Sequence, residues 1–246
     1  MAVSERRTLM GQGQIVRSST NAPTADATWK PLYRVGAVAM FLLGLAWLMV
    51  TVTGGMIGTA PGNTTAYLSA LGSHSGTAYF SYTVTGIADL LIIPAALALY
   101  FGFRKVSPTW MLLAMVVLVT CMAIDLATFV PTALALIALA TATQTTAVVG
   151  AAHFGLATVP VYQFFGWVVP NLAFLPIAIA ARRFGRFGKL TFVVGLAFVA
   201  FGIAGGVAFI YPSPGLAAYQ LPGLFLEGVF WVMLGFLMLR VNRDAA

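Results

Sequence analysis

Charged residues are scarce in this 246-residue chain, where Asp, Glu, Lys and Arg together make up only 8%. A soluble domain carries about 25% charged residues, so the sequence leaves no room for a soluble domain of any size. Hydrophobic residues reach 60% and the mean hydropathy is +0.94. We therefore expect an all-α integral membrane protein whose partner is the lipid bilayer. The net charge of +7 marks the cytoplasmic side of such a protein, so no nucleic-acid partner is expected.

Residues that hold cofactors are also few. The single cysteine, Cys121, lies within an apolar run, so no intrachain disulfide can form. The sequence has no Cys-x-x-Cys, no pair of membrane-embedded histidines for haem, and no Gly-x-Ser-x-Gly nucleophile motif. We predict no cofactor, and non-catalytic functions are favoured over an enzyme. His74 and His153 are expected on the outer side, where an outer metal site with Asp125 is less favoured than two solvated histidines because no close ligand spacing supports the metal.

The chain is long enough for about six spans of roughly 20 residues with loops. A membrane domain is predicted over residues 31–240, between a polar tail of residues 1–30 and a short tail of residues 241–246. The predicted spans cover about 35–57, 79–103, 110–130, 160–181, 190–211 and 218–239. The fourth span contains Pro160, Pro170 and Pro176, so we expect it to be bent.

The orientation follows from the basic residues. Arg182, Arg183, Arg186 and Lys189 lie between two apolar runs, whereas the loop of residues 58–78 has no Lys or Arg. If residues 131–159 crossed the membrane, the basic group at 182–189 would lie outside, against the positive-inside rule. We therefore interpret 131–159 as a non-spanning outer segment, either an amphipathic helix or an extension of the third span that ends near His153. All 13 Lys and Arg then lie inside, with both termini cytoplasmic, as in a multi-pass protein of a bacterial inner membrane.

Three acidic residues fall inside predicted spans: Asp89, Asp125 and Glu227. At 1.5 Å per residue, each lies roughly 20 Å from the inner ends of its helix, so the three can meet at one depth. Asn171 adds an amide at a similar level. Residues that share a helix face with each acid are also polar or small; they are Ser81 and Thr85, then Cys121, Thr128 and Thr132, then Gln220, Gly223 and Trp231.

An intramembrane acid has two interpretations. Each carboxyl can bond a neighbouring helix and serve only packing. Alternatively, Asp89, Asp125, Asn171 and Glu227 form a shared proton or cation site. A carboxyl without a cationic partner in hydrocarbon is expected to be neutral, because its charged form loses its hydration.

Small residues four apart allow close helix approach. Gly54 and Gly58 in the first span and Gly202 and Gly206 in the fifth have this spacing. They can pack within the chain or against a helix of a partner subunit or second copy.

The second half of the chain carries short motifs that resemble those of a known protein family. They are Phe164-Phe165-Gly166, the basic stretch Arg182 to Gly188 followed by Gly195 and Gly202, and Leu226 to Trp231. Asp89 to Tyr100 followed by Arg104 fits as well. Over about residues 33–239 the chain resembles a bacterial family of six-span membrane proteins known only as a domain of unknown function. The resemblance implies the topology and no particular reaction.

Three functions follow as hypotheses. The first is a non-catalytic polytopic subunit or accessory protein that packs against other membrane proteins, or as a homo-oligomer, through its small-residue faces. The second is a small proton- or cation-linked transporter that uses Asp89, Asp125 and Glu227. The third is a cofactor-binding or enzymatic membrane subunit with the outer histidines as ligands.

Overall fold

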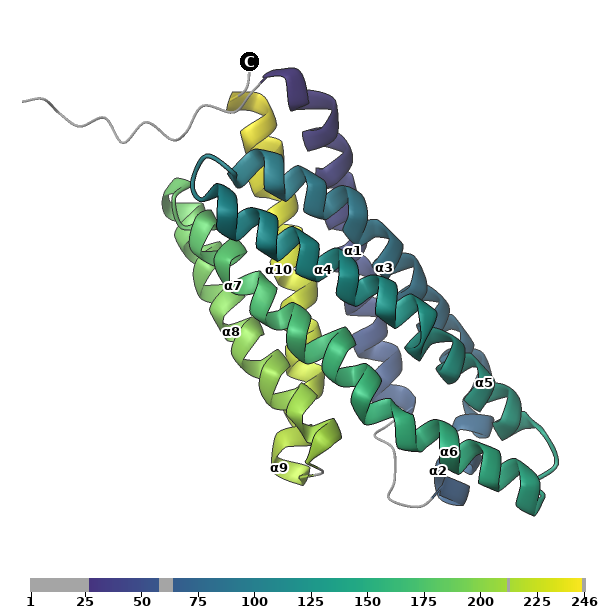
Figure 1. Ribbon diagram of the computed structural model, residues 1–246. Coiled ribbons are helices and arrows are strands. Elements are labelled where there is room, and N and C mark those ends of the chain that lie inside the picture. The colour runs from purple at the N-terminus through teal and green to yellow at the C-terminus, as the bar shows by residue number, and fades with distance from the viewer. Residues whose placement is uncertain (1–26, 58–63, 212, 245–246) are drawn as a thin grey trace, which may run out of the picture.

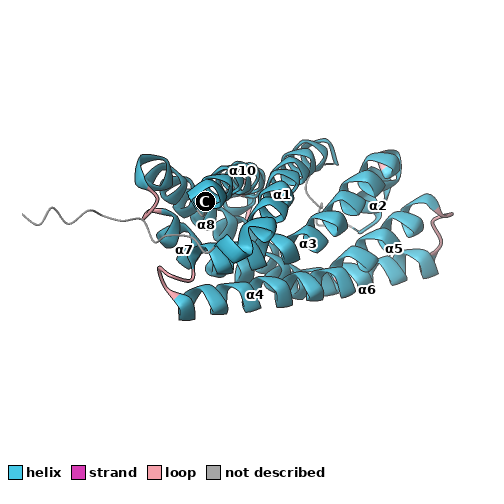
Figure 2. Ribbon diagram, turned by 90° about the horizontal axis from the view of Figure 1, so that it is seen from above, coloured by secondary structure: helices cyan, strands magenta, loops and turns pink. Residues whose placement is uncertain are grey.

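The computed structural model of the chain describes residues 27–57, 64–211 and 213–244. Every regular element of these residues is helical (Figures 1 and 2), which confirms the all-α prediction. In chain order the elements are the 3-10 helix η1 (Ala27–Trp29), α1 (Lys30–Ile57), α2 (Thr64–Ser73), α3 (Ser75–Phe103), α4 (Pro108–Ala127), α5 (Phe129–Thr141), α6 (Thr146–Gln163), the π-helix η2 (Phe164–Val168), α7 (Val169–Ala181), α8 (Gly185–Ile210), α9 (Pro214–Ala217) and α10 (Gln220–Asp244).

Six helical stretches in the described residues are long and apolar enough to cross a membrane, as the sequence predicts. They are Ala27–Met56, Ser75–Phe103, Pro108–Thr141, Thr146–Ala181, Gly185–Ala208 and Pro214–Asp244. The third and fourth join shorter helices into continuous rods of 34 and 36 residues. At 1.5 Å per residue each rod is about 50 Å long, well beyond a hydrocarbon core of about 30 Å.

The expected non-spanning segment at residues 131–159 is not a separate element. Its first part is α5, which continues the direction of α4, and its second part is α6, which leads through η2 into α7. The Thr-rich stretch between them makes the turn, where the Thr145 side chain accepts a hydrogen bond from the Val148 N–H at 3.3 Å. The structure has no separate outer amphipathic helix here. α5 extends the third span, which is the other alternative that the sequence left open, although it ends at Thr141 and not near His153; α6 pairs with α5 as a helical hairpin.

The predicted loop at residues 58–78 also differs from the structure. It contains the helix α2, and α3 begins at Ser75, four residues before the predicted start. Periodic burial explains both differences, because a separate small core joins α2, α3, α5 and α6. Its buried residues are Leu68, Leu71, Ala78, Leu136, Ile137 and Ala152.

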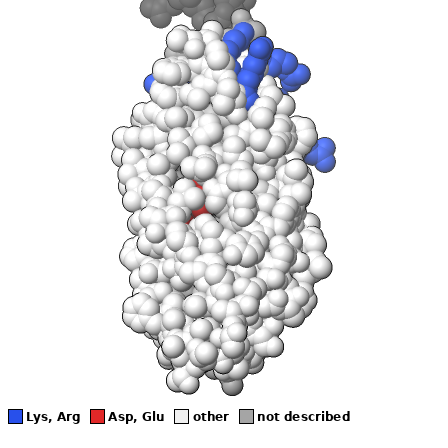
Figure 3. Space-filling view, turned by 90° about the vertical axis from the view of Figure 1, so that its right-hand side faces the viewer, with Lys and Arg blue, Asp and Glu red and all other residues white. Residues whose placement is uncertain are grey.

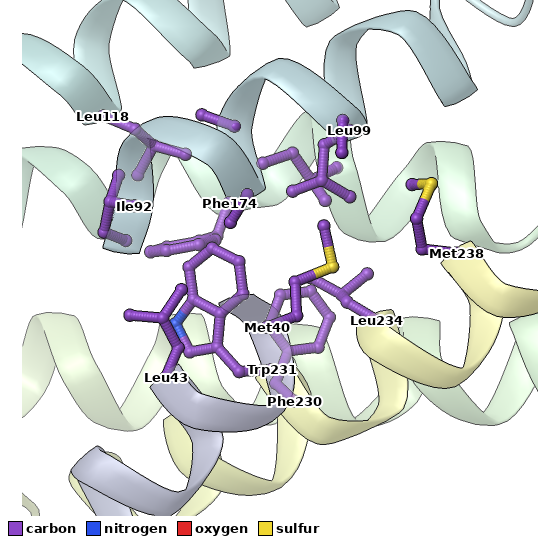
Figure 4. Close-up of a cluster of buried hydrophobic side chains, with 14 of the residues drawn as sticks. Met40, Leu43, Ile92, Leu99, Leu118, Phe174, Phe230, Trp231, Leu234 and Met238 are labelled. Carbon is purple, nitrogen blue, oxygen red and sulfur yellow. The ribbon is translucent and has the colours of Figure 1, made fainter. Parts of the chain in front are cut away.

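The main core lies where α1 packs between α3 and α10. Gly44 and Gly228 let α1 and α10 approach closely, because a Cβ at Gly44 would lie 2.7 Å from the Gly228 carbonyl oxygen. Beside this crossing, aromatic rings from three helices interlock (Figure 4). Phe174 of α7 has its ring centroid 5.2 Å from that of Trp231 on α10 and 5.1 Å from that of Phe198 on α8. These contacts join α7, α8 and α10.

The described cations gather at one end of the bundle, which we term the basic end (Figure 3). They occupy the start of α1, the α3–α4 turn, the α7–α8 turn and the last turns of α10; they are Lys30, Arg34, Arg104, Lys105, Arg182, Arg183, Arg186, Lys189, Arg240 and Arg243. The cations of the predicted tail at residues 1–26 lie outside the described residues. The other end of the bundle, which we term the opposite end, carries α2, α9 and the α5–α6 turn (Figure 1).

The predicted packing glycines have different surroundings. A Cβ at Gly206 would lie 2.6 Å from Val168 Cγ2, and one at Gly202 would lie 2.6 Å from Asn171 Oδ1, so both face the α7 rod within the chain. A Cβ at Gly54 would meet only Leu221, at an ordinary 3.7 Å. Gly58 lies outside the described residues. The spacing on α8 therefore serves packing between helices of one chain.

Candidate functional site

Asp89 is the most deeply buried acid among the described residues, with 1% of its surface exposed. It lies on α3 within a face that also buries Thr85 and Ser81. Neither of its carboxyl oxygens has an N–H or O–H donor among the described residues. The Asp125 carboxyl of α4 lies close enough to interact with it, and so does Glu227 of α10. Two carboxyls can hydrogen-bond each other only when one carries a proton.

Asp125 of α4 packs against the π-helix η2, which interrupts the fourth helical rod between α6 and α7. Its Oδ1 atom packs against Gly166 so closely that a Cβ at this position would collide with it. Gly166 is the central residue of the π-helix η2. Single π turns insert one extra residue into a helix and occur often at functional sites. Because Gly166 has no side chain, its backbone lies directly against the Asp125 carboxyl.

One backbone bond, one proline and one side chain define the hydrogen bonding of this break. The Val169 N–H donates to the Phe164 carbonyl, five residues back. Pro170 has no N–H to continue the ladder. The Asn171 Nδ2 atom donates to the Trp167 carbonyl at 2.8 Å, one turn before it. Asn171 Oδ1 has no donor among the described residues and lies against Gly202.

Glu227 is held differently from the two aspartates. It is 8% exposed, and the Trp231 Nε1 atom one turn later donates to its Oε1 atom at 3.4 Å. Cys121, one turn before Asp125, adds a titratable thiol near the cluster. We term Asp89, Asp125 and Glu227 the carboxyl cluster. A small patch of acidic surface is visible at mid-height of the bundle, recessed among uncharged side chains, far from the blue basic end (Figure 3).

No family of known proteins, no curated protein and no solved structure matches this chain. The functional argument accordingly rests on the carboxyl cluster and the helices that position it.

The structure brings together the three acids that the sequence singled out. Asn171 lies on the same rod as Gly166 but packs on α8, and the described contacts connect it to the broken helix and not to a carboxyl. Sequence reasoning missed Gly166. The signal available was Pro170, four residues later, because a proline inside a span releases the carbonyl one turn before it.

The two histidines are apart and near the surface. The His153 Nδ1 atom lies 3.3 Å from Thr64 Oγ1, whereas the His74 Nδ1 atom lies 3.0 Å from Ser73 Oγ. Within the described residues no three His, Cys, Asp or Glu side chains are grouped so that they could hold a metal ion. The outer metal site with Asp125 is therefore wrong for this structure, since Asp125 faces Asp89 and Gly166 in the interior.

Proposed function

We propose that this chain is a proton-linked membrane transporter whose proton-binding site is the carboxyl cluster. In this proposal both termini and the basic end face the cytoplasm, in a bacterial inner membrane. The gathering of ten described cations at one end supports that orientation, because Lys and Arg are retained on the cytoplasmic side.

The observation that carries the proposal is the environment of Asp89. A carboxyl 1% exposed and without a donor is costly to keep in a span, where an acid at the centre costs about 2.5–3.5 kcal/mol on insertion scales. Packing alone does not need a second carboxyl against it. Two adjacent carboxyls instead hold one proton readily and lose it when water reaches them.

The broken fourth rod provides a means of coupling. Interrupted helices line the ion and substrate sites of transporters, because their backbone can change arrangement at low cost. Gly166 of η2 packs directly against Asp125. In this proposal, a change in the charge of the Asp89–Asp125 pair therefore acts on η2, the segment that changes its arrangement. Proton uptake and the geometry of η2 are coupled in this proposal.

A direct test uses the full chain in lipid vesicles. Infrared difference spectra between high and low pH report protonated carboxyls through their C=O stretch. We expect a C=O band that is lost in Asp89→Asn and Asp125→Asn. The matched control Asp244→Asn removes an exposed acid at the end of α10 and should leave the band unchanged.

Transport is then measured with a pH dye trapped in proteoliposomes while small cations, organic anions and uncharged solutes are added in turn. Proton movement that depends on one of them and on Asp89 supports the proposal. A carboxyl band that survives in Asp89→Asn, or proton movement that is the same in that variant, refutes it.

The accessory-subunit function remains the second candidate. The bond between Trp231 and Glu227 within one helix favours it, because at least this acid also contributes to packing. Extraction in mild detergent discriminates between the two. A constant co-purifying membrane protein supports the accessory function, and a homogeneous monomer with Asp89-dependent proton movement supports the transporter.

A further inference from the structure

Buried polar side chains are distributed unevenly about the carboxyl cluster. Nine polar or charged side chains are buried among the described residues. Besides the acids and Asn171, those toward the opposite end are Thr53, Ser81, Thr85 and Gln163. Only Thr191 among them lies toward the basic end, and its hydroxyl donates to the Phe187 carbonyl of its own helix at 3.0 Å. The Tyr33 hydroxyl lies at the basic end itself, beside the Phe101 carbonyl.

The helix α3 shows the contrast along one face. Toward the opposite end, Thr85 and Ser81 follow Asp89 at intervals of four residues and are 6% and 5% exposed. Toward the basic end the same face continues with Ile92, Ala96 and Leu99, each 2% exposed or less. Residues three, four and seven apart share a face, so Asp89 lies where hydroxyls give way to hydrocarbon.

The hydroxyls beside Asp89 form a polar face. Thr53 Oγ1 of α1 donates to Ser81 Oγ at 2.9 Å, and Thr85 Oγ1 donates to the Ser81 backbone carbonyl at 3.1 Å. Thr53 also lines an open cavity of about 350 Å³ whose other lining residues, Leu48, Met49, Val52 and Phe80, are apolar. Because a hydroxyl both donates to and accepts from water, this face can hold water beside Asp89, whose carboxyl oxygens have no donor among the described residues.

The other two acids lie at similar boundaries. On α4, Leu118, Ala114 and Met111 are buried toward the basic end, whereas Thr128 and Thr132 follow Asp125 toward the opposite end. On α10, Gln220 and Gly223 precede Glu227, and the residues that follow it toward the basic end are Phe230, Trp231 and Leu234, all fully buried.

The apolar side of the boundary is closed. Trp231 is one turn from Glu227 and packs with Phe174, which also meets Phe198 and Phe230 (Figure 4). Interlocked rings leave no room for a chain of water molecules.

We propose that the carboxyl cluster exchanges protons with one side of the membrane only, through Ser81 and Thr85, from the opposite end of the bundle. The aromatic layer of Phe174, Phe198, Phe230 and Trp231 seals it from the basic end. This inference rests on the proposed function in requiring an exchangeable proton on Asp89. In the proposed orientation the cluster opens to the outer face, and Ser81 and Thr85 are positioning residues whose hydroxyls line the route.

The test follows hydrogen–deuterium exchange of the Asp89 carboxyl by infrared spectroscopy, with the full chain in lipid films exposed to D₂O. In the double variant Ser81→Ala with Thr85→Val we expect exchange slower by about tenfold or more, the factor for a barrier raised by about 1.4 kcal/mol. Thr53→Val should have a smaller effect. The matched control is Thr191→Val, a buried hydroxyl with the same bond to its own helix but on the basic side.

The outcomes separate the two proposals. If the Asp89 band is absent from the wild-type protein, both the proposed function and the route are refuted. If the band is present and lost in Asp89→Asn, yet exchanges equally fast in the double variant, only the route is refuted. Equal slowing in Thr191→Val would also refute it, since the slowing would then not depend on which side of the cluster the hydroxyl lies. Should the double variant fold poorly, the single variants Ser81→Ala and Thr53→Val, each compared with Thr191→Val, give the same test.

Discussion

The half of the bundle nearest the basic end and the half nearest α2 share the long helices α1, α3, α8 and α10 but bury different side chains about the carboxyl cluster. Toward the basic end the core is hydrocarbon and aromatic rings, including Leu99, Leu118, Trp231 and Leu234. Toward the opposite end the same helix faces bury hydroxyls and an amide. The carboxyl cluster lies at the boundary. Under the proposed function, the apolar half seals the carboxyl cluster and the polar half gives access to it.

The largest effect is expected in the apolar half. Leu118→Ala removes a fully buried side chain and should lower the free energy of unfolding by about 2–5 kcal/mol. Thr85→Val in the polar half should cost only about 1 kcal/mol, for one lost hydrogen bond. Reversible unfolding in mixed detergent and SDS measures both. Equal losses would show that the two halves do not differ in this way.

The next effect lies at the boundary. Gly166→Ala places a methyl group against Asp125 Oδ1, and such overpacking costs about 1–3 kcal/mol. We also expect a shifted carboxyl band, because the Asp125 side chain must move. Gly150→Ala is the control, since nothing lies within 4 Å of its Cβ position. It should stabilise α6 by about 0.5–1 kcal/mol. An unchanged carboxyl band in Gly166→Ala would show that the geometry of η2 does not affect the carboxyl cluster.

A smaller effect should separate two indoles whose Nε1 atoms are both buried. Trp231→Phe removes the donor to Glu227 Oε1, whereas Trp47→Phe removes an Nε1 atom without a partner among the described residues. The unfolding free energies should differ by about 1 kcal/mol, the net worth of a hydrogen bond. If Trp47→Phe costs as much, the Glu227 bond contributes nothing to stability.

The smallest effect is expected on the surface of the polar half, at the end of α1. Gly54→Ala meets only Leu221 at 3.7 Å, so its free energy of unfolding should change by less than about 0.5 kcal/mol. Gly206→Ala, which would press on Val168 at 2.6 Å, is the destabilising counterpart. A loss of oligomers or of a co-purifying protein in Gly54→Ala alone would instead assign Gly54 to a partner interface.

Part of the site could be predicted from the sequence. Counting residues from the basic ends of α3, α4 and α10 gave Asp89, Asp125 and Glu227 a common depth, because a helix rises by a fixed amount per residue. Trp231 could be placed beside Glu227 as well, because residues four apart share a helix face. Gly166 could not be assigned to Asp125 in this way, because their contact depends on which helix lies beside which.

The sequence by itself determined the six apolar helices and the gathering of cations at one end, since hydropathy and charge are local properties of a segment. It could not determine that residues 131–159 divide between α5 and α6, nor that α2 forms, because both depend on burial against Leu136, Ile137 and their neighbours. Only the tertiary structure decided that Asp89 faces Asp125 beside a π turn. That arrangement arises from packing between segments far apart in the chain, which no local pattern records.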